Sequence, residues 1–287
     1  MSRVLIIGAT GTVGREIAAQ LTNPAIQVRA MVRQPESVRL LPHIEVMRGD
    51  LTLPETLDEC LIGVDTVFLV WTAPPSALTQ SLERIAKHAR RIVFLSAPLK
   101  TPHPFFQQPN PSRTLAESIE RLIESSGLAR TFLRPGMFAA NALRWWAPAI
   151  RANAAIRWPC LAAPTAPIHE RDIAAVAVRV LCEESHSGKD YVLTGPESLS
   201  QAEQLSTIGR VVGRSLQIEE MTPDEARREW GAFMPVSVVN MLLDAWVAAL
   251  GQPAYVTSTV AEITGVPART FHDWATDHAA EFALPAA

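Results

Sequence analysis

The chain opens on Val4-Leu5-Ile6-Ile7-Gly8-Ala9-Thr10-Gly11-Thr12-Val13-Gly14, an apolar run that leads into three evenly spaced glycines. Such a run is typical of a parallel strand buried on both faces, and a helical pattern follows at once. Glycines between a strand and a helix let the backbone turn sharply and approach a pyrophosphate, which the amides and dipole of the helix start favour. We therefore predict a dinucleotide-binding turn rather than a simple tight turn, with contacts from Gly8, Thr10, Gly11, Thr12, Val13 and Gly14.

The alternation of strand and helix continues through the first half of the chain. Apolar runs predict further buried strands at residues 28–32, 44–47, 66–70, 92–95 and 131–133. Between them, apolar residues recur at helical spacing in residues 12–21, 76–89 and 115–125. Gly127 is placed to end the last of these helices. The pattern predicts an α/β fold built on a Rossmann-type, doubly wound parallel sheet.

The alternation stops after residue 136, where the chain becomes rich in Trp and Pro. One more helical pattern and one short strand follow within residues 167–195. We expect an NAD(P)-binding domain and a smaller, mainly helical C-terminal substrate or cap region. The first comprises residues 1–136 with 167–195 packing back onto it, and the second comprises residues 137–166 and 196–287.

Helix signals are clear in the distal part of the chain. Ser200 with Glu203 forms a capping box, and Thr222 with Glu225 forms another that has Pro at the first helical position. Further helices are predicted at residues 236–250 and after Thr270. These signals predict structure and carry no chemistry.

Composition excludes several classes of protein. The 287 residues are 48% hydrophobic and 19% charged, with a formal net charge of −3, so the chain lacks the basic field that nucleic acid requires. Three scattered cysteines predict neither a disulfide framework nor a metal site. No apolar run is long enough to span a bilayer, and the N-terminus enters a core strand without a secretory signal pattern. We expect a cytoplasmic protein with no membrane or nucleic-acid partner.

Residues after the next strands refine the coenzyme prediction. Where NAD-specific folds place an acidic residue after the second strand, this chain has Arg33. A guanidinium there can bind a 2′-phosphate, which favours NADP(H) over NAD(H); the alternative is a solvated arginine. Asp50 and Leu51 either contact adenine or form a turn. Trp71 and Thr72 are expected to border the coenzyme, although Trp71 can equally belong to the core.

Together these residues resemble a known family. The glycine turn, Arg33, and Leu133-Arg134-Pro135-Gly136-Met137-Phe138 followed by Asn141 look like the NmrA-like group of atypical short-chain dehydrogenases, over about residues 1–195. The segment from His169 to Ala174 is also similar to that group. The resemblance implies an NAD(P)-binding fold related to quinone oxidoreductases and isoflavone-reductase-like proteins. The group also includes regulators that bind NADP without known turnover.

The usual catalytic pair of short-chain dehydrogenases, Tyr-x-x-x-Lys, is missing. Tyr191 and Tyr255 are the only tyrosines, and neither has a lysine at the required spacing. Isoflavone-reductase relatives use a helix lysine instead, and the matching position here is Ala116. No catalytic residue is therefore assigned. Hydride transfer remains possible because water can supply the proton.

Three side chains remain as catalytic candidates, each with a structural alternative. Ser96 follows a strand and can meet substrate or cap a turn. Glu120 can line the substrate face of its helix or be solvated. His169 titrates near neutral pH but can be structural. The predicted substrate pocket is apolar and aromatic, with core packing as the alternative for each aromatic; its residues are Phe105, Met137, Phe138, Asn141, Trp145 and His169, with Phe106, Trp146 and Trp158 as further candidates.

Three functions are consistent with these patterns. The first is an NADPH-dependent oxidoreductase that reduces a small apolar quinone, carbonyl or imine by hydride transfer. The second is a catalytically silent NADP(H) sensor that reports to a protein partner. The third is a non-redox isomerase or cyclase on the same scaffold.

Overall fold

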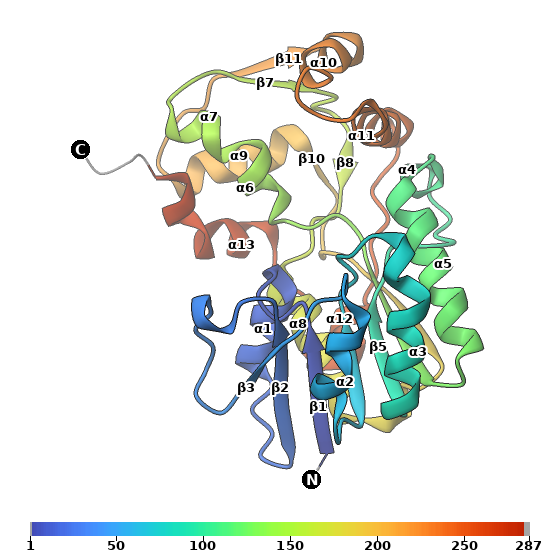
Figure 1. Cartoon of the computed structure of the whole chain (residues 1–287). Helices are drawn as coiled ribbons and strands as arrows, with labels where there is room; N and C mark the ends of the chain where they lie inside the picture. The colour runs from blue at the N-terminus through green and yellow to red at the C-terminus, as the bar shows by residue number, and fades with distance from the viewer. Residues whose placement is uncertain (1, 284–287) are drawn as a thin grey trace.

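A seven-stranded parallel sheet forms the centre of the molecule, as the sequence predicts (Figure 1). The computed structural model describes residues 2–283. The strand order is β3-β2-β1-β4-β5-β6-β9, so the direction of winding reverses beside β1, where α/β folds bind ligands. The strands are β1 (Ser2–Ile7), β2 (Ile26–Val32), β3 (Glu45–Arg48), β4 (Thr66–Leu69), β5 (Arg91–Leu95), β6 (Ala129–Pro135) and β9 (Lys189–Leu193).

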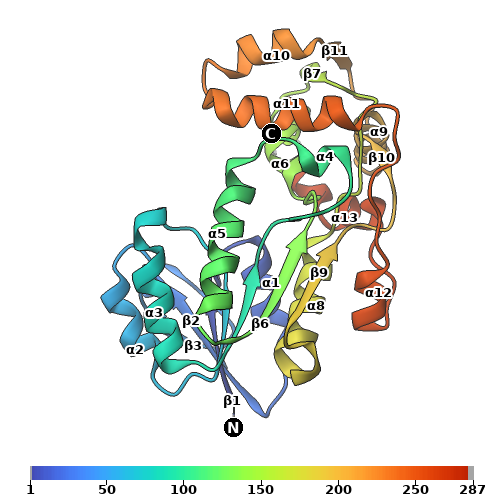
Figure 2. The same cartoon turned by 90° about the vertical axis from the view of Figure 1, so that its right-hand side faces the viewer.

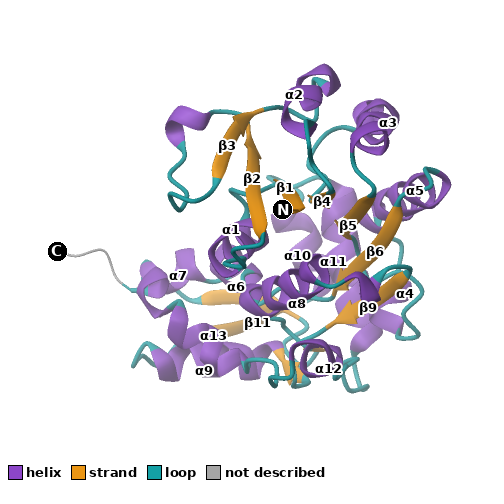
Figure 3. Cartoon of the chain, turned by 90° about the horizontal axis from the view of Figure 1, so that it is seen from below, coloured by secondary structure: helices purple, strands orange, loops and turns teal. Residues whose placement is uncertain are grey.

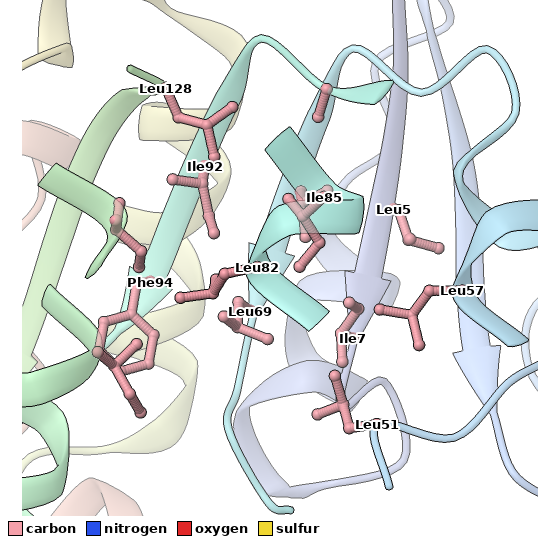
Figure 4. Close-up of a cluster of buried hydrophobic side chains, with 14 of the residues drawn as sticks. Leu5, Ile7, Leu51, Leu57, Leu69, Leu82, Ile85, Ile92, Phe94 and Leu128 are labelled. Atoms are coloured by element: carbon pink, nitrogen blue, oxygen red, sulfur yellow. The ribbon is translucent and has the colours of Figure 1, made fainter. Parts of the chain in front are cut away.

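Helices cover both faces of this sheet (Figure 3). One face carries α2 (Leu57–Leu61), α3 (Leu78–His88) and α5 (Pro111–Ser125), and the other carries α1 (Thr12–Gln20), α8 (Glu170–Cys182) and α12 (Thr259–Thr264). Alternate residues of β1 face the two helical layers. Leu5 and Ile7 pack against the layer of α2, α3 and α5, whereas Val4 and Ile6 pack against the layer of α1, α8 and α12. Figure 4 shows Leu5 and Ile7 within the first of these layers. Burial on both faces explains why the strand is apolar throughout.

The cap region lies beyond the carboxyl edge of the sheet (Figure 2). Its core is a tryptophan cluster in which the ring centroids of Trp158 and Trp230 are 4.9 Å apart and those of Trp158 and Trp246 are 5.5 Å apart. Two small strand pairs, which the sequence did not predict, join distant segments: β7 (Ile156–Pro159) with β11 (Ile218–Met221), and β8 (Pro164–Thr165) with β10 (Leu199–Ser200). The remaining helices are α4 (Pro104–Gln107), α6 (Asn141–Trp145), α7 (Ala147–Arg151), α9 (Gln201–Val211), α10 (Pro223–Trp230), α11 (Val236–Ala249) and α13 (Phe271–Asp277).

Local helix signals mostly coincide with the observed ends. Both predicted capping boxes are present, at Ser200 and at Thr222. Gly127 follows α5 with a φ of +79°, the left-handed conformation expected just beyond a helix end. However, α5 begins at Pro111, four residues before the predicted start at residue 115, because the Asn110 side chain caps it by accepting from the amide of Arg113.

The segment around α12 departs from the predicted division of the chain. It lies within residues 196–287, which the sequence assigned to the cap, but Val260 is buried among the side chains of α1 and α8. Thr257 fixes this return, since its amide donates to Thr194 Oγ1 over 2.9 Å and its hydroxyl donates to the carbonyl oxygen of Val192. The chain thus comes back to the sheet after the cap. Among the described helices, none is long and apolar enough to cross a membrane.

Candidate coenzyme and substrate site

The glycine turn after β1 is shaped by close backbone contacts. Gly8 has a φ of +93°, and a Cβ on Gly14 would lie 2.1 Å from the carbonyl oxygen of Gly8. Both positions therefore need glycine for the turn itself. Gly11 differs, because its φ of −78° suits any residue and a Cβ there would meet only the Gly8 carbonyl oxygen, at 3.3 Å. Gly11 keeps open the space in front of α1.

The first turn of α1 offers unpaired hydrogen-bond donors. Gly11 is the N-cap and no side chain caps the helix, whose first turn carries no acidic residue. Within residues 2–283 the amides of Thr12, Val13 and Gly14 have no hydrogen-bond acceptor. Free amides and the positive end of the helix dipole suit a pyrophosphate. These residues therefore fit the phosphates of a dinucleotide.

A cleft of about 1100 Å³ adjoins this turn; we call it the basic cleft. Its lining includes four arginines, namely Arg15, Arg33, Arg39 and Arg48, together with Thr10 and Asp50. Arg48 pairs with Glu36 at 3.0 Å, whereas Arg33 is exposed and has no ion-pair partner in the described part of the chain. Arg15 was not predicted as a coenzyme contact, although its position in α1 just after the glycines could have indicated it.

The other predicted coenzyme contacts occupy different environments. Asp50 lines the basic cleft, and its carboxylate also accepts a hydrogen bond from the amide of Thr52 at 2.8 Å. The residue therefore forms a turn and is also accessible to a ligand in the cleft. The Leu51 side chain is buried in the core, which leaves only its backbone for a ligand. Trp71 packs against the same core, and its indole N–H is buried without an acceptor among the described residues. Thr72 is exposed.

A second cavity, of about 920 Å³, lies at the carboxyl ends of β5 and β6; we call it the aromatic pocket. Five of the six predicted substrate residues line it: Phe105, Met137, Phe138, Asn141 and Trp145. Helix α11 and the loop before it add Phe233, Met234 and Met241, and α10 adds Trp230. This second group was not predicted, because it lies about ninety residues further along the chain.

Two predicted pocket residues are placed elsewhere by the structure. His169 is 1% exposed and does not line the aromatic pocket. Its Nδ1 accepts from the amide of Arg171 and so caps α8, while its Nε2 lies 3.2 Å from an Asp277 carboxylate oxygen. The structure thus shows His169 holding α8 against the C-terminal segment, in line with its structural alternative, and a catalytic or substrate role stays a prediction. Trp146 is fully buried in the cap core and is also absent from the lining.

Ser96 and Glu120 meet in one buried network. The Ser96 hydroxyl donates to Glu120 Oε1 over 2.6 Å, and Arg134 donates to both carboxylate oxygens, at 2.9 and 2.6 Å. Burial alone would lower the pKa of the Arg134 guanidinium, but the hydrogen bonds with Glu120 and the negative charges of Glu120, Asp190 and Glu124 together raise it. Glu120 is 5% exposed, so the solvated alternative is wrong, and neither Ser96 nor Glu120 lines the aromatic pocket. The network fixes the ends of β5 and β6 beside that pocket.

The aromatic pocket has no strong proton donor among its described lining residues. No tyrosine, lysine or histidine belongs to the lining. Ala116, at the position of the lysine in isoflavone-reductase relatives, is buried in the core. The Tyr191 hydroxyl lies 2.7 Å from His186 Nδ1, on the outer strand β9. Over residues 2–283, no group of three or more His, Cys, Asp or Glu residues is arranged to hold a metal ion.

Comparison with known proteins agrees with this arrangement. A family model described as NAD(P)H-binding matches residues 8–184. The chain is 38% identical to the (4-alkanoyl-5-oxo-2,5-dihydrofuran-3-yl)methyl phosphate reductase of Streptomyces griseus, covering 98% of this chain and 99% of that one. It is 33% identical to the NAD(P)H azoreductase of Xenophilus azovorans, covering 97% and 99%.

Among solved structures, the NADPH complex of the quinone oxidoreductase QOR2 from Escherichia coli superposes with a TM-score of 0.80 at 22% identity, covering 96% of this chain and 99% of that one. This likeness shows the shared fold. The match to the family model and the identities of 38% and 33% show that the chain belongs to the NAD(P)H-binding, NmrA-like family of oxidoreductases.

Proposed function

We propose that the protein is an NADPH-dependent reductase of small, flat, apolar acceptors such as quinones, activated carbonyls and imines. One observation carries the proposal: the glycine turn with its basic cleft and the aromatic pocket both lie at the carboxyl edge of one parallel sheet. A coenzyme and an aromatic substrate can thus meet there. The named activities of the two relatives, both reductases, support the same class of reaction.

Each part of the site has a defined task in this proposal. The amides of Thr12 and Val13 bind the pyrophosphate, and Arg33 binds the 2′-phosphate that distinguishes NADPH from NADH. A bound nicotinamide supplies the hydride. The aromatic pocket excludes water and holds the ring of the acceptor flat against its aromatic walls.

The lining also sets which acceptors can react. Asn141, a polar residue of the lining, donates its amide N–H to Met137 Sδ over 3.0 Å, and an amide is not an acid that can protonate a substrate. Without a Tyr–Lys pair, the proton comes from water, so acceptors that take hydride readily are favoured over plain ketones.

The test is NADPH oxidation with a quinone, an imine and a plain ketone. We expect turnover with the first two, little with the ketone, and transfer of deuterium from only one of the two C4-deuterated forms of NADPH. Coenzyme binding without oxidation by any acceptor would contradict the reductase and favour the NADP(H) sensor. Conversion of a substrate without coenzyme would favour an isomerase or cyclase.

Replacing Arg33 by alanine should selectively weaken NADPH binding. The charge-assisted contact with the 2′-phosphate contributes about 1–3 kcal/mol, so NADPH affinity falls roughly ten- to hundred-fold while NADH affinity changes little. Calorimetric titration with both coenzymes measures the effect. Arg121→Ala removes one positive charge from the exposed face of α5 and serves as the matched control. Equal losses for NADPH and NADH in the Arg33 variant would remove the assignment.

A further inference from the structure

The aromatic pocket contains two positive charges and no negative one. Arg113, in the first turn of α5, and Arg144, in α6, both belong to its described lining, which includes no aspartate or glutamate. A cavity for neutral substrates would not need the half-buried Arg113, because a guanidinium withdrawn from water beside apolar walls is costly to desolvate, and the exposed Arg144 adds a second positive charge to the same lining. The pair therefore needs an explanation beyond the proposed reductase reaction.

Of the two arginines, Arg113 is the better placed to bind an anion. It is half-buried and donates a hydrogen bond to the carbonyl oxygen of Gln108, but no carboxylate of the described residues lies within ion-pair distance. Burial lowers the pKa of the Arg113 guanidinium, and no neighbouring acid offsets this. Among the other arginines withdrawn from water, Arg29 and Arg134 each pair with a glutamate, and Arg91 donates to the carbonyl oxygens of Val180 and Glu183, whereas Arg113 donates to one carbonyl oxygen only. Arg113 thus holds a charge whose partner is missing from the chain itself.

The surroundings of Arg113 also favour an anion. The side chain lies beside Asn110 and Ser112 at the positive end of the fifteen-residue helix α5, whose first turn has no acidic residue. Arg144 is exposed at the same cavity and has no ion pair within residues 2–283. The same lining includes Met234, Met241 and Phe233, which offer adaptable apolar contacts.

From this arrangement, we propose that the substrate of the aromatic pocket carries an oxyanion, a carboxylate, phosphate or sulfonate, on a flat apolar body, with Arg113 as its main contact and Arg144 as a second. The inference rests on the proposed function in taking this pocket as the substrate site. Arginine suits such groups because its fork of N–H donors can bind two oxygens of one anion. The anion sets the orientation of the body in the pocket, and the apolar walls hold the body itself.

The test compares ligands that differ only in charge and cannot be reduced. Calorimetry measures the binding of naphthalene-2-carboxylate, naphthalene-2-sulfonate and 2-naphthyl phosphate, and of the neutral naphthalene-2-carboxamide, with and without saturating NADP⁺. We expect the best anion to bind roughly ten- to hundred-fold more tightly than the carboxamide. The ranking of the three anions then identifies which oxyanion fits.

Variants show whether the arginines cause the preference. Arg113→Gln should remove most of it, Arg144→Gln should reduce it, and Arg113→Lys should restore part of it. Arg121→Gln, on the exposed face of the same helix, should keep it. A thermal melt checks that each variant folds. Because Arg144 is exposed, we expect Arg144→Gln to fold, so this variant still tests the proposal if Arg113→Gln does not fold.

The outcomes separate this inference from the reductase proposal. Equal binding of anions and carboxamide by the wild-type protein would overturn the anion site, as would a preference that persists in both glutamine variants. Selective binding of anions without any NADPH oxidation would uphold the anion site and count against the reductase.

Discussion

Gly11→Val is expected to abolish most coenzyme binding while the protein stays folded. The valine side chain would project into the space in front of α1, where the pyrophosphate must approach the amides of Thr12 and Val13. Losing about two charge-assisted hydrogen bonds would weaken NADPH binding by roughly a hundred-fold or more. Calorimetric titration measures the affinity, and thermal denaturation measures the stability. We expect the unfolding free energy to change by only about 1 kcal/mol, because Gly11 has an ordinary φ and an exposed position.

Gly14→Val is the matched comparison on the same turn. Its Cβ would lie 2.1 Å from the Gly8 carbonyl oxygen and 2.8 Å from Ala9 Cα, both backbone atoms that cannot move aside cheaply. This variant should therefore lose stability as well as binding. Undiminished NADPH binding by Gly11→Val would contradict the role assigned to the glycine turn.

Glu120→Ala should produce a large loss of stability. The substitution leaves the Arg134 guanidinium, which is 8% exposed, without its main partner, and it also frees the Ser96 hydroxyl. Removing one member of a buried ion pair typically costs about 3–5 kcal/mol. Asp190, 3.0 Å from Arg134 but partly exposed, compensates only in part, so we expect a loss near the lower end of that range. Urea denaturation followed by tryptophan fluorescence measures it.

The control for this experiment lies one turn earlier on the same helix. Glu117 is exposed and makes no ion pair with the described residues, so Glu117→Ala should change stability by less than about 0.5 kcal/mol. If both alanine variants had the same small effect, the network of Ser96, Glu120 and Arg134 would not be holding the ends of β5 and β6.

The sheet could be predicted because its signals are local. Leu5 and Ile7 face one helical layer and Val4 and Ile6 face the other, so the strand is apolar at every position and stands out in the sequence. The cap was harder. The pairing of β7 with β11 joins segments about sixty residues apart, and neither strand alone has a distinctive pattern. The return of α12 to α8 likewise depends on tertiary packing that no local signal encodes.

The same distinction applies to the site. Phe105, Met137, Phe138, Asn141 and Trp145 were predicted because they follow strands at the edge where ligands bind. The contacts of His169 and Glu120 could not be predicted because their partners, Asp277 and Arg134, lie on other elements. Met241 and Phe233 reach the pocket from a segment far along the chain. A single sequence shows which residues follow a strand, but it does not show which side chains meet.

The most direct test of the account is calorimetric titration of the purified protein with NADPH, NADP⁺, NADH and NAD⁺, run at two temperatures so that a small binding enthalpy cannot hide an interaction. The account predicts saturable binding of one coenzyme per chain, with the 2′-phosphorylated forms the tighter. Absence of heat with all of them at both temperatures would contradict the assignment of the glycine turn and with it the proposed reductase.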